Sequence, residues 1–161
     1  WILGRPRGSA SGQTCCLDRF RQVGHGFERI VNKLLGVVAM NLMEIANELV
    51  AGCRESRELA NLDKLYAPDA VSVEAADMGN GRETVGVEGI KEKHAWFDSM
   101  FEMLGGTVGG PFPHGDDRFA VTFKMDAKNK ETGEVSVMEE VAVYHVADGK
   151  IVREEFFYTG E

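Results

Sequence analysis

The sequence is poor in cysteine and proline and has no long hydrophobic run. Its 161 residues include 3 cysteines and 4 prolines, and Cys15, Cys16 and Cys53 have the spacing of neither a disulfide framework nor a zinc site. The apolar run from Leu34 to Met40 is far shorter than the roughly 20 residues of a membrane-spanning helix. With 26 acidic and 18 basic side chains the net charge is -8, which repels phosphate backbones and anionic lipid. We therefore expect a cytoplasmic protein that binds neither nucleic acid nor membrane.

Several motifs of nucleotide, metal and serine chemistry are missing. The segment from Gly79 to Thr84 lacks the third glycine of a dinucleotide fingerprint and the Gly-Lys-Ser/Thr end of a phosphate-binding loop. The four histidines are widely separated in the sequence, which does not suggest a metal site. No serine lies in a Gly-x-Ser-x-Gly elbow. The sequence therefore predicts no cofactor and no metal.

Charge divides the chain near Met40. Residues 1–39 carry six basic and two acidic side chains and residues 40–161 carry 12 and 24, so the net charges are +4 and -12. We expect residues 40–161 to form one domain, since this length suffices for a core. Three interpretations of residues 1–39 stay open: a transit-like leader, an arm that packs on the domain or a partner, or sequence upstream of a natural start at Met40. The change in charge favours the third.

Hydrophobic spacing predicts helices and then strands in residues 40–161. Asn41 and Glu44 form a capping-box pattern, Pro68 limits the second helix, and Gly105-Gly106 stops the third. The expected helices are 41–54, 56–66 and 87–104, and the expected strands are 70–75, 107–112, 118–126, 134–146 and 151–159. Four strands in succession after the last helix indicate an α+β fold with an antiparallel meander.

Three segments of this domain resemble a known superfamily. Leu65-Tyr66-Ala67-Pro68-Asp69-Ala70-Val71 is similar to the L-(F/Y)-x-x-D-A signature of the nuclear transport factor 2-like superfamily, which includes ketosteroid isomerases and SnoaL-like polyketide cyclases. The segments Gly86 to Ile90 and Asp148 to Val152 lie where that superfamily has similar ones. The resemblance covers about residues 41–159. It implies a cone-shaped curved antiparallel sheet packed on three helices, a cystatin-like α+β barrel, with a small apolar molecule in the cone and a homodimer through the sheet.

The resemblance places a catalytic base at Glu74, on the less apolar face of the first expected strand. In ketosteroid isomerases a tyrosine and a protonated aspartate assist the base by forming an oxyanion hole. The aspartate position corresponds to Glu140, whereas the tyrosine position corresponds to Val50, which has no hydroxyl group. Tyr144 lies four residues after Glu140, on the same strand face, and is a replacement donor. The alternatives are a solvated Glu74 and a Tyr144 that only fills the core.

His94 interrupts the apolar stripe of the third expected helix. Cyclases and dehydratases of the superfamily often use a histidine with a carboxylate, so the resemblance implies a proton relay from His94 to Glu74 or Glu140. The alternative is a structural histidine with one hydrogen-bonding partner.

Apolar side chains at helix and strand spacing either line a pocket or fill the core. The expected substrate-binding residues are Val50, Phe97, Phe101, Phe156 and Tyr158.

The acidic pairs Glu139-Glu140 and Glu154-Glu155 are a further hint of a polar site. Because side chains alternate along a strand, one carboxylate of each pair is expected on the concave face of the sheet. Burial of a carboxylate there is costly unless the cavity is wet or functional.

Two functions remain open. The first is a cofactor-free isomerase, cyclase or dehydratase that acts by general acid/base proton transfer on an apolar carbonyl compound. The second is a non-catalytic ligand-binding or dimerisation module. A cluster of Glu74, Glu140 and His94 around an open cavity favours the enzyme, and a filled cone with Glu74 in solvent favours the module.

Overall fold

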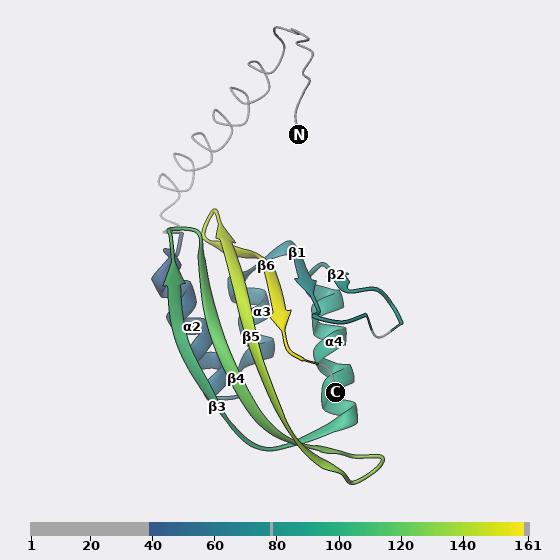
Figure 1. Ribbon diagram of the computed structural model, residues 1–161. Coiled ribbons are helices and arrows are strands. Elements are labelled where there is room, and N and C mark those ends of the chain that lie inside the picture. The colour runs from purple at the N-terminus through teal and green to yellow at the C-terminus, as the bar shows by residue number, and fades with distance from the viewer. Residues whose placement is uncertain (1–38, 78, 160–161) are drawn as a thin grey trace, which may run out of the picture. The chain divides into compact units, whose positions relative to one another are not determined.

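The computed structural model describes residues 39–77 and 79–159, so the interpretations of residues 1–38 lie outside the described residues. The described part has three helices and a single sheet (Figure 1). Two helices come first, two strands and the third helix follow, and the last four strands complete the sheet. The elements are α2 (Leu42–Arg54), α3 (Glu58–Leu65), β1 (Tyr66–Val73), β2 (Glu83–Val85), α4 (Val87–Met100), β3 (Phe101–His114), β4 (Arg118–Asn129), β5 (Val135–Ala147) and β6 (Lys150–Phe157). Among these residues no helix is both long and apolar enough to cross a membrane.

The first helix begins where the sequence predicts. The side chain of Asn41 accepts a hydrogen bond from the Glu44 amide, and the Glu44 carboxylate accepts one from the Asn41 amide, which completes the capping box. The apolar stripe of α2 faces the core, where Ile45 and Leu49 are buried.

The sheet is curved and its strands are ordered β2-β1-β6-β5-β4-β3 (Figure 1). The strands from β3 to β6 form the predicted antiparallel meander. The sheet as a whole is mixed rather than antiparallel, because β1 pairs with β6 in the parallel direction. The short strand β2, which the sequence analysis missed, pairs with β1 at one edge.

Several predicted boundaries were wrong, among them the start of β3, which lies at Phe101 instead of residue 107. The third helix ends at Met100 instead of continuing to Leu104, because Phe101 and Met103 already pair with the backbone of β4. Strand pairing replaces helical hydrogen bonds there, although the apolar spacing continues. The first strand covers 66–73 instead of 70–75, so Glu74 follows its last residue.

One turn is confirmed by its backbone. Asp148 and Gly149 both have positive φ, 50° and 75°, which is the geometry of a two-residue turn between right-twisted antiparallel strands.

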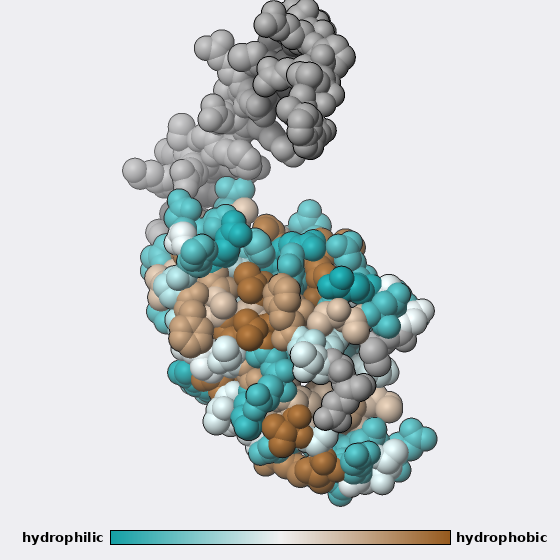
Figure 2. Space-filling model, viewed as in Figure 1, coloured by the Kyte–Doolittle hydropathy of each residue, from teal (hydrophilic) through white to brown (hydrophobic). Residues whose placement is uncertain are grey.

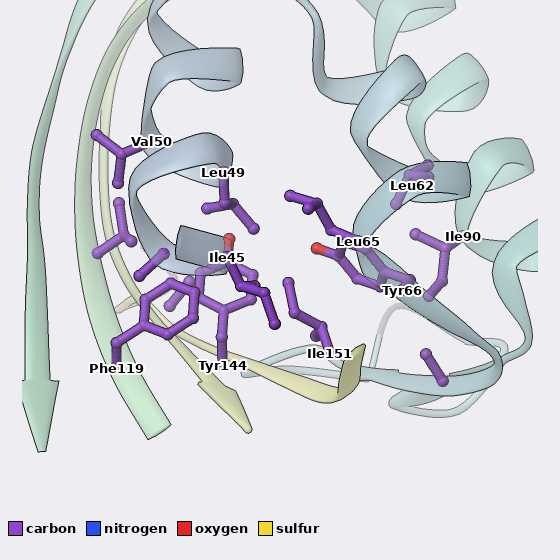
Figure 3. Packing of buried hydrophobic residues seen from close by; sticks show 14 of the residues in the cluster. Ile45, Leu49, Val50, Leu62, Leu65, Tyr66, Ile90, Phe119, Tyr144 and Ile151 are labelled. Atoms are coloured by element: carbon purple, nitrogen blue, oxygen red, sulfur yellow. The ribbon is translucent and has the colours of Figure 1, made fainter. Parts of the chain in front are cut away.

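The hydrophobic core lies between the inner face of the sheet and the helices (Figure 3). Ile45 and Leu49 of α2 face Phe119 of β4 and Tyr144 of β5, and the two aromatic rings stack with their centroids 5.1 Å apart. Burying a large apolar side chain of this kind stabilises the fold by about 1.5 to 3 kcal/mol. The core therefore fixes the strands that carry the polar side chains described next.

Candidate functional site

Polar side chains gather on the inner face of the sheet beside α4. Register places Ser72 of β1 next to Glu154 of β6, and Glu154 next to Tyr144 of β5. Both Ser72 and Glu154 are buried, with 1% and 2% of their surface exposed. Because α4 packs against β1, its side chains reach this part of the face.

The ammonium group of Lys93, on α4, is the centre of the cluster. Its Nζ donates hydrogen bonds to Ser72 Oγ at 2.5 Å and to Glu74 Oε1 at 2.7 Å. The same nitrogen lies 3.7 Å from Glu154 Oε1 and 4.5 Å from the centroid of the Phe156 ring. A cation over an aromatic face is attracted by the ring quadrupole, so Lys93 is held by charge, hydrogen bonds and the ring together.

Glu154 is a buried carboxylate with one satisfied oxygen. The hydroxyl of Tyr66 donates to Glu154 Oε2 at 2.6 Å, whereas Glu154 Oε1 has no hydrogen-bond partner among the described residues. Burial, followed by the charge of Glu154, raises the pKa of Tyr66 well above its usual range. Tyr66 is therefore a permanent hydrogen-bond donor to Glu154.

Glu140 is half-buried on β5 and differs from Glu74 in its surroundings. In the described part of the chain its carboxyl group forms no ion pair and no hydrogen bond. Burial, followed by the negative charge of Glu74, raises the pKa of Glu140 to about 7. A carboxyl group with this pKa exchanges its proton near neutral pH, as general acid/base catalysis requires.

Glu140 lines an open groove of about 780 Å³ beyond the end of β6. Tyr158 and Ala75 also line it, and the hydroxyl of Tyr158 donates to Glu74 Oε2 at 3.2 Å. Glu140 is among the lining residues, whereas Glu74 is next to the groove, where its side chain is 27% exposed and bonded to Tyr158. The groove is open to solvent rather than an enclosed cavity.

Two further predicted residues lie near the cluster but outside the groove lining. Burial lowers the pKa of His94, and the charge of Glu154 partly offsets this effect. Tyr144 is 3% exposed and stacks on Phe119, so its ring belongs to the core, and burial raises the pKa of its hydroxyl.

The predicted apolar contacts occupy different places. Val50 is 2% exposed and packs in the core under α2. Phe97 and Phe101 stack with centroids 5.0 Å apart where α4 passes into β3. Phe156 lies under Lys93, and of these five residues only Tyr158 lines the groove.

The alternation of the acidic pairs agrees with the structure. Glu140 and Glu154 are the more buried members, whereas Glu139 forms an ion pair with Lys124 at 2.8 Å and Glu155 one with Arg153.

Lys93 and Tyr66 were missed as site residues. A signal for Lys93 was present, because it lies three residues after the buried Ile90 and four before Phe97, on the inward side of α4. Tyr66 is part of the signature that carries the resemblance, but its partner Glu154 is 88 residues away.

Comparisons with known proteins point to one family. A family model described as the SnoaL-like domain matches residues 40–158. A search of curated proteins finds no match. Among solved structures, a Mesorhizobium loti protein named as a candidate SnoaL-like polyketide cyclase is 36% identical, with a TM-score of 0.69 over 74% of this chain and 100% of its own.

Two more distant structures share the fold. A nuclear transport factor 2-like protein from Burkholderia pseudomallei is 18% identical, with a TM-score of 0.61 over 73% of this chain and 89% of its own. A protein from Bacillus subtilis named as a candidate isomerase is 22% identical, with a TM-score of 0.58 over 74% of this chain and 90% of its own. At these identities the likeness concerns the fold alone.

Proposed function

The chain belongs to the SnoaL-like domain family, and we propose that it is a cofactor-free enzyme of the isomerase, cyclase or dehydratase type. Its substrate is a small apolar carbonyl compound, and its chemistry is general acid/base proton transfer. Members of one fold catalyse different reactions, so the proposal rests on the site.

The observation that carries the proposal is the contrast between two carboxyl groups. Glu74 is in an ion pair with Lys93, whereas Glu140 has no cation within ion-pair distance among the described residues and has a pKa raised to about 7. Two carboxyl groups whose environments differ in this way divide into a base and an acid. Glu140 also lines the open groove, where a ligand can reach it.

In the proposed reaction Glu74 is the base. Its carboxylate takes a proton from the carbon next to the substrate carbonyl, the C–H electron pair forms a carbon–carbon double bond, and the carbonyl electrons move to the oxygen. The neutral carboxyl group of Glu140 donates a hydrogen bond to this oxygen. An oxyanion donor of this kind is typically worth about 3 to 4 kcal/mol. In a substrate with a carbon–carbon double bond attached to the deprotonated carbon, the enolate extends over that bond, and return of the proton from Glu74 to the far carbon of the bond completes an isomerisation.

The other predicted site residues have supporting roles in this proposal. Tyr158 keeps the Glu74 carboxylate oriented through its 3.2 Å hydrogen bond. His94, with its lowered pKa, is neutral near pH 7 and assists proton transfer. Phe123, which pairs with Glu140 across β4 and β5, gives the groove an apolar contact for the carbon skeleton of the substrate.

The experiment is a proton-exchange assay in deuterated water. Cyclic ketones, including steroid and polyketide-like compounds, are incubated with the protein, and loss of the proton signal next to the carbonyl is followed by NMR. We expect exchange with at least one compound, and a loss of about 100-fold or more in Glu74→Gln and Glu140→Gln.

Glu139→Gln is the matched control, because Glu139 lines the same groove as Glu140, but its side chain is 66% exposed and forms an ion pair with Lys124. Equal losses in Glu139→Gln and Glu140→Gln contradict the proposal. So does exchange that survives in Glu74→Gln.

A second candidate function, a non-catalytic ligand-binding module, is favoured by one observation. The Glu74 carboxylate is engaged by both Lys93 and Tyr158, which suits a structural role as well as a catalytic one. A ligand raises the melting temperature by mass action whether or not it reacts. A thermal shift without proton exchange in any compound therefore supports the module.

We also propose that two copies associate through the outer face of the sheet. Apolar side chains gather on the face seen in Figure 2, and four exposed ones lie on neighbouring parts of β5 and β6. They are Val135, Val137, Val141 and Phe157. Exposed apolar patches of this kind mark interaction surfaces.

The test of association is sedimentation velocity. The wild type is expected to sediment as a dimer and Val137→Lys as a monomer. Val85→Lys is the control, because Val85 is 66% exposed on the distant edge strand β2. A wild-type monomer contradicts the proposed dimer.

A further inference from the structure

The Lys93 ammonium lies between two carboxylates, and it forms a hydrogen bond with only one of them. It is hydrogen-bonded to Glu74 Oε1 at 2.7 Å, and it lies 3.7 Å from Glu154 Oε1. The latter oxygen is buried and has no hydrogen-bond partner among the described residues. Polar atoms buried in this way are rare in native structures, and each one calls for an explanation.

We infer that Lys93 is a positioning residue that moves between these carboxylates, contacting Glu74 while Glu74 is charged and turning to the free oxygen of Glu154 when Glu74 receives a proton. The inference rests on the proposed function in one respect, namely that Glu74 is the group that receives the proton.

The movement is small. A charge-assisted hydrogen bond between an ammonium and a carboxylate has a length of about 2.7 to 2.9 Å, so Lys93 Nζ needs to approach Glu154 Oε1 by only about 1 Å. The four-carbon stem of lysine makes such a shift easy. The Phe156 ring lies 4.5 Å from Nζ, and it attracts the ammonium over a broad face in both positions.

The charges of the cluster favour the movement. With Glu74 charged, one ammonium faces two carboxylates, and the nearer one retains it. With Glu74 neutral, Glu154 is the remaining negative partner, and a buried carboxylate left without a cation is costly. Tyr66 cannot take the place of Lys93, because its hydroxyl is already engaged by the other oxygen of Glu154.

Several hydroxyl and titratable groups of neighbouring elements form hydrogen bonds or electrostatic interactions with this cluster. They are Ser72 and Tyr66 of β1, Glu154 of β6, Tyr158 after β6, Glu140 and Tyr144 of β5, His94 of α4, and Cys53 of α2. Lys93 is the cation nearest to both carboxylates within the described residues.

The test uses Glu74→Gln, in which a neutral amide of the same shape stands for the protonated carboxyl group. A crystal structure of this variant is expected to place Lys93 Nζ within about 3.2 Å of Glu154 Oε1. Wild-type crystals grown near neutral pH are the reference and are expected to show Lys93 on Glu74. The inference is overturned if Lys93 occupies the same position in both structures.

Glu154→Gln is the matched variant, because its side chain still accepts the Tyr66 hydroxyl but carries no charge. Lys93 is then expected to remain on Glu74. In solution, the 15N signal of the Lys93 side chain is expected to change in Glu74→Gln and to stay near its wild-type position in Glu154→Gln. The reverse order overturns the inference.

Lys93→Arg supplies a further check. The planar fork of the guanidinium has enough donors to contact the side chains at positions 74 and 154 at once, so the additional Glu74→Gln substitution is expected to move it less than it moves Lys93, and an equal movement overturns the inference. None of these measurements needs turnover. Absence of proton exchange in the ketone assay therefore contradicts the proposed function alone, whereas an unmoved Lys93 contradicts this inference alone.

Discussion

The inner face of one sheet is apolar under α2 and polar beside α4. Under α2, Phe119 and Tyr144 stack against each other and pack on Ile45, and no charge is present in this cluster. Beside α4, the inward-facing side chains are instead charged, namely Lys93 of α4 and Glu154 of β6. The same strands β5 and β6 contribute to both regions. The apolar region therefore stabilises the fold through burial, whereas the polar region places charges where burial is costly, which points to a functional site.

The largest effect is expected in the apolar region. Phe119→Ala removes a side chain that is 0% exposed, and the loss of transfer free energy together with the cavity should lower the free energy of unfolding by about 3 to 5 kcal/mol. Urea denaturation measures it. Phe112→Ala is the control, because Phe112 is 53% exposed, and a loss of similar size there would show that burial in the apolar region is not what stabilises the fold.

The next effect concerns pH and Glu140. The unfolded chain releases this proton near the usual value of 4.5, whereas the folded protein holds it until about pH 7. Between these values the folded state binds more protons, so stability falls as pH rises. With allowance for the partial solvent contact of Glu140, this carboxyl group is expected to lower the free energy of unfolding by about 2 to 3 kcal/mol between pH 4.5 and pH 7.

Glu140→Gln is therefore expected to be more stable than the wild type above pH 7 and to show a flatter profile between pH 4.5 and 7. Thermal unfolding across this range measures both. A Glu140→Gln profile parallel to that of the wild type would contradict the assignment.

A smaller effect distinguishes the two buried tyrosines. Tyr66→Phe removes the 2.6 Å hydrogen bond to Glu154 and leaves a buried carboxylate with less support, which should cost about 1 to 3 kcal/mol. Tyr144→Phe should cost less, because the Tyr144 hydroxyl has no hydrogen-bond partner within the described residues. Equal costs in chemical denaturation would show that the two regions do not differ in this respect.

The smallest effect is expected on the outer face. Glu139→Gln removes an exposed ion pair with Lys124, and such pairs contribute little. Its denaturation midpoint should equal that of the wild type at every pH tested. A pH dependence like that of Glu140 would mean that burial does not separate the two neighbours.

The sequence predicts this division in part. Alternation along a strand is local, which is why one carboxylate of each acidic pair could be predicted on the inner face, although the pattern does not say which one. The capping box at Asn41 and the turn at Asp148 are local for the same reason.

The rest depends on contacts between distant segments. The parallel pairing of β1 with β6 brings Ser72 beside Glu154, and no pattern within either strand specifies that register. Lys93 was overlooked because a lysine on a helix is usually exposed, and only its partners on β1 and β6 explain its inward position. The end of α4 at Met100 was likewise decided by pairing with β4.

The most direct test of the central claim is a carbon-13 NMR titration of the Glu140 side-chain carboxyl group in the full chain, assigned by its loss in Glu140→Gln. The expected midpoint is near 7, set by burial and by the charge of Glu74. The Glu74→Gln substitution is expected to lower this midpoint, because it removes that charge. A midpoint near 4.5, unchanged in Glu74→Gln, would contradict the claim that Glu140 is the acid of a catalytic pair.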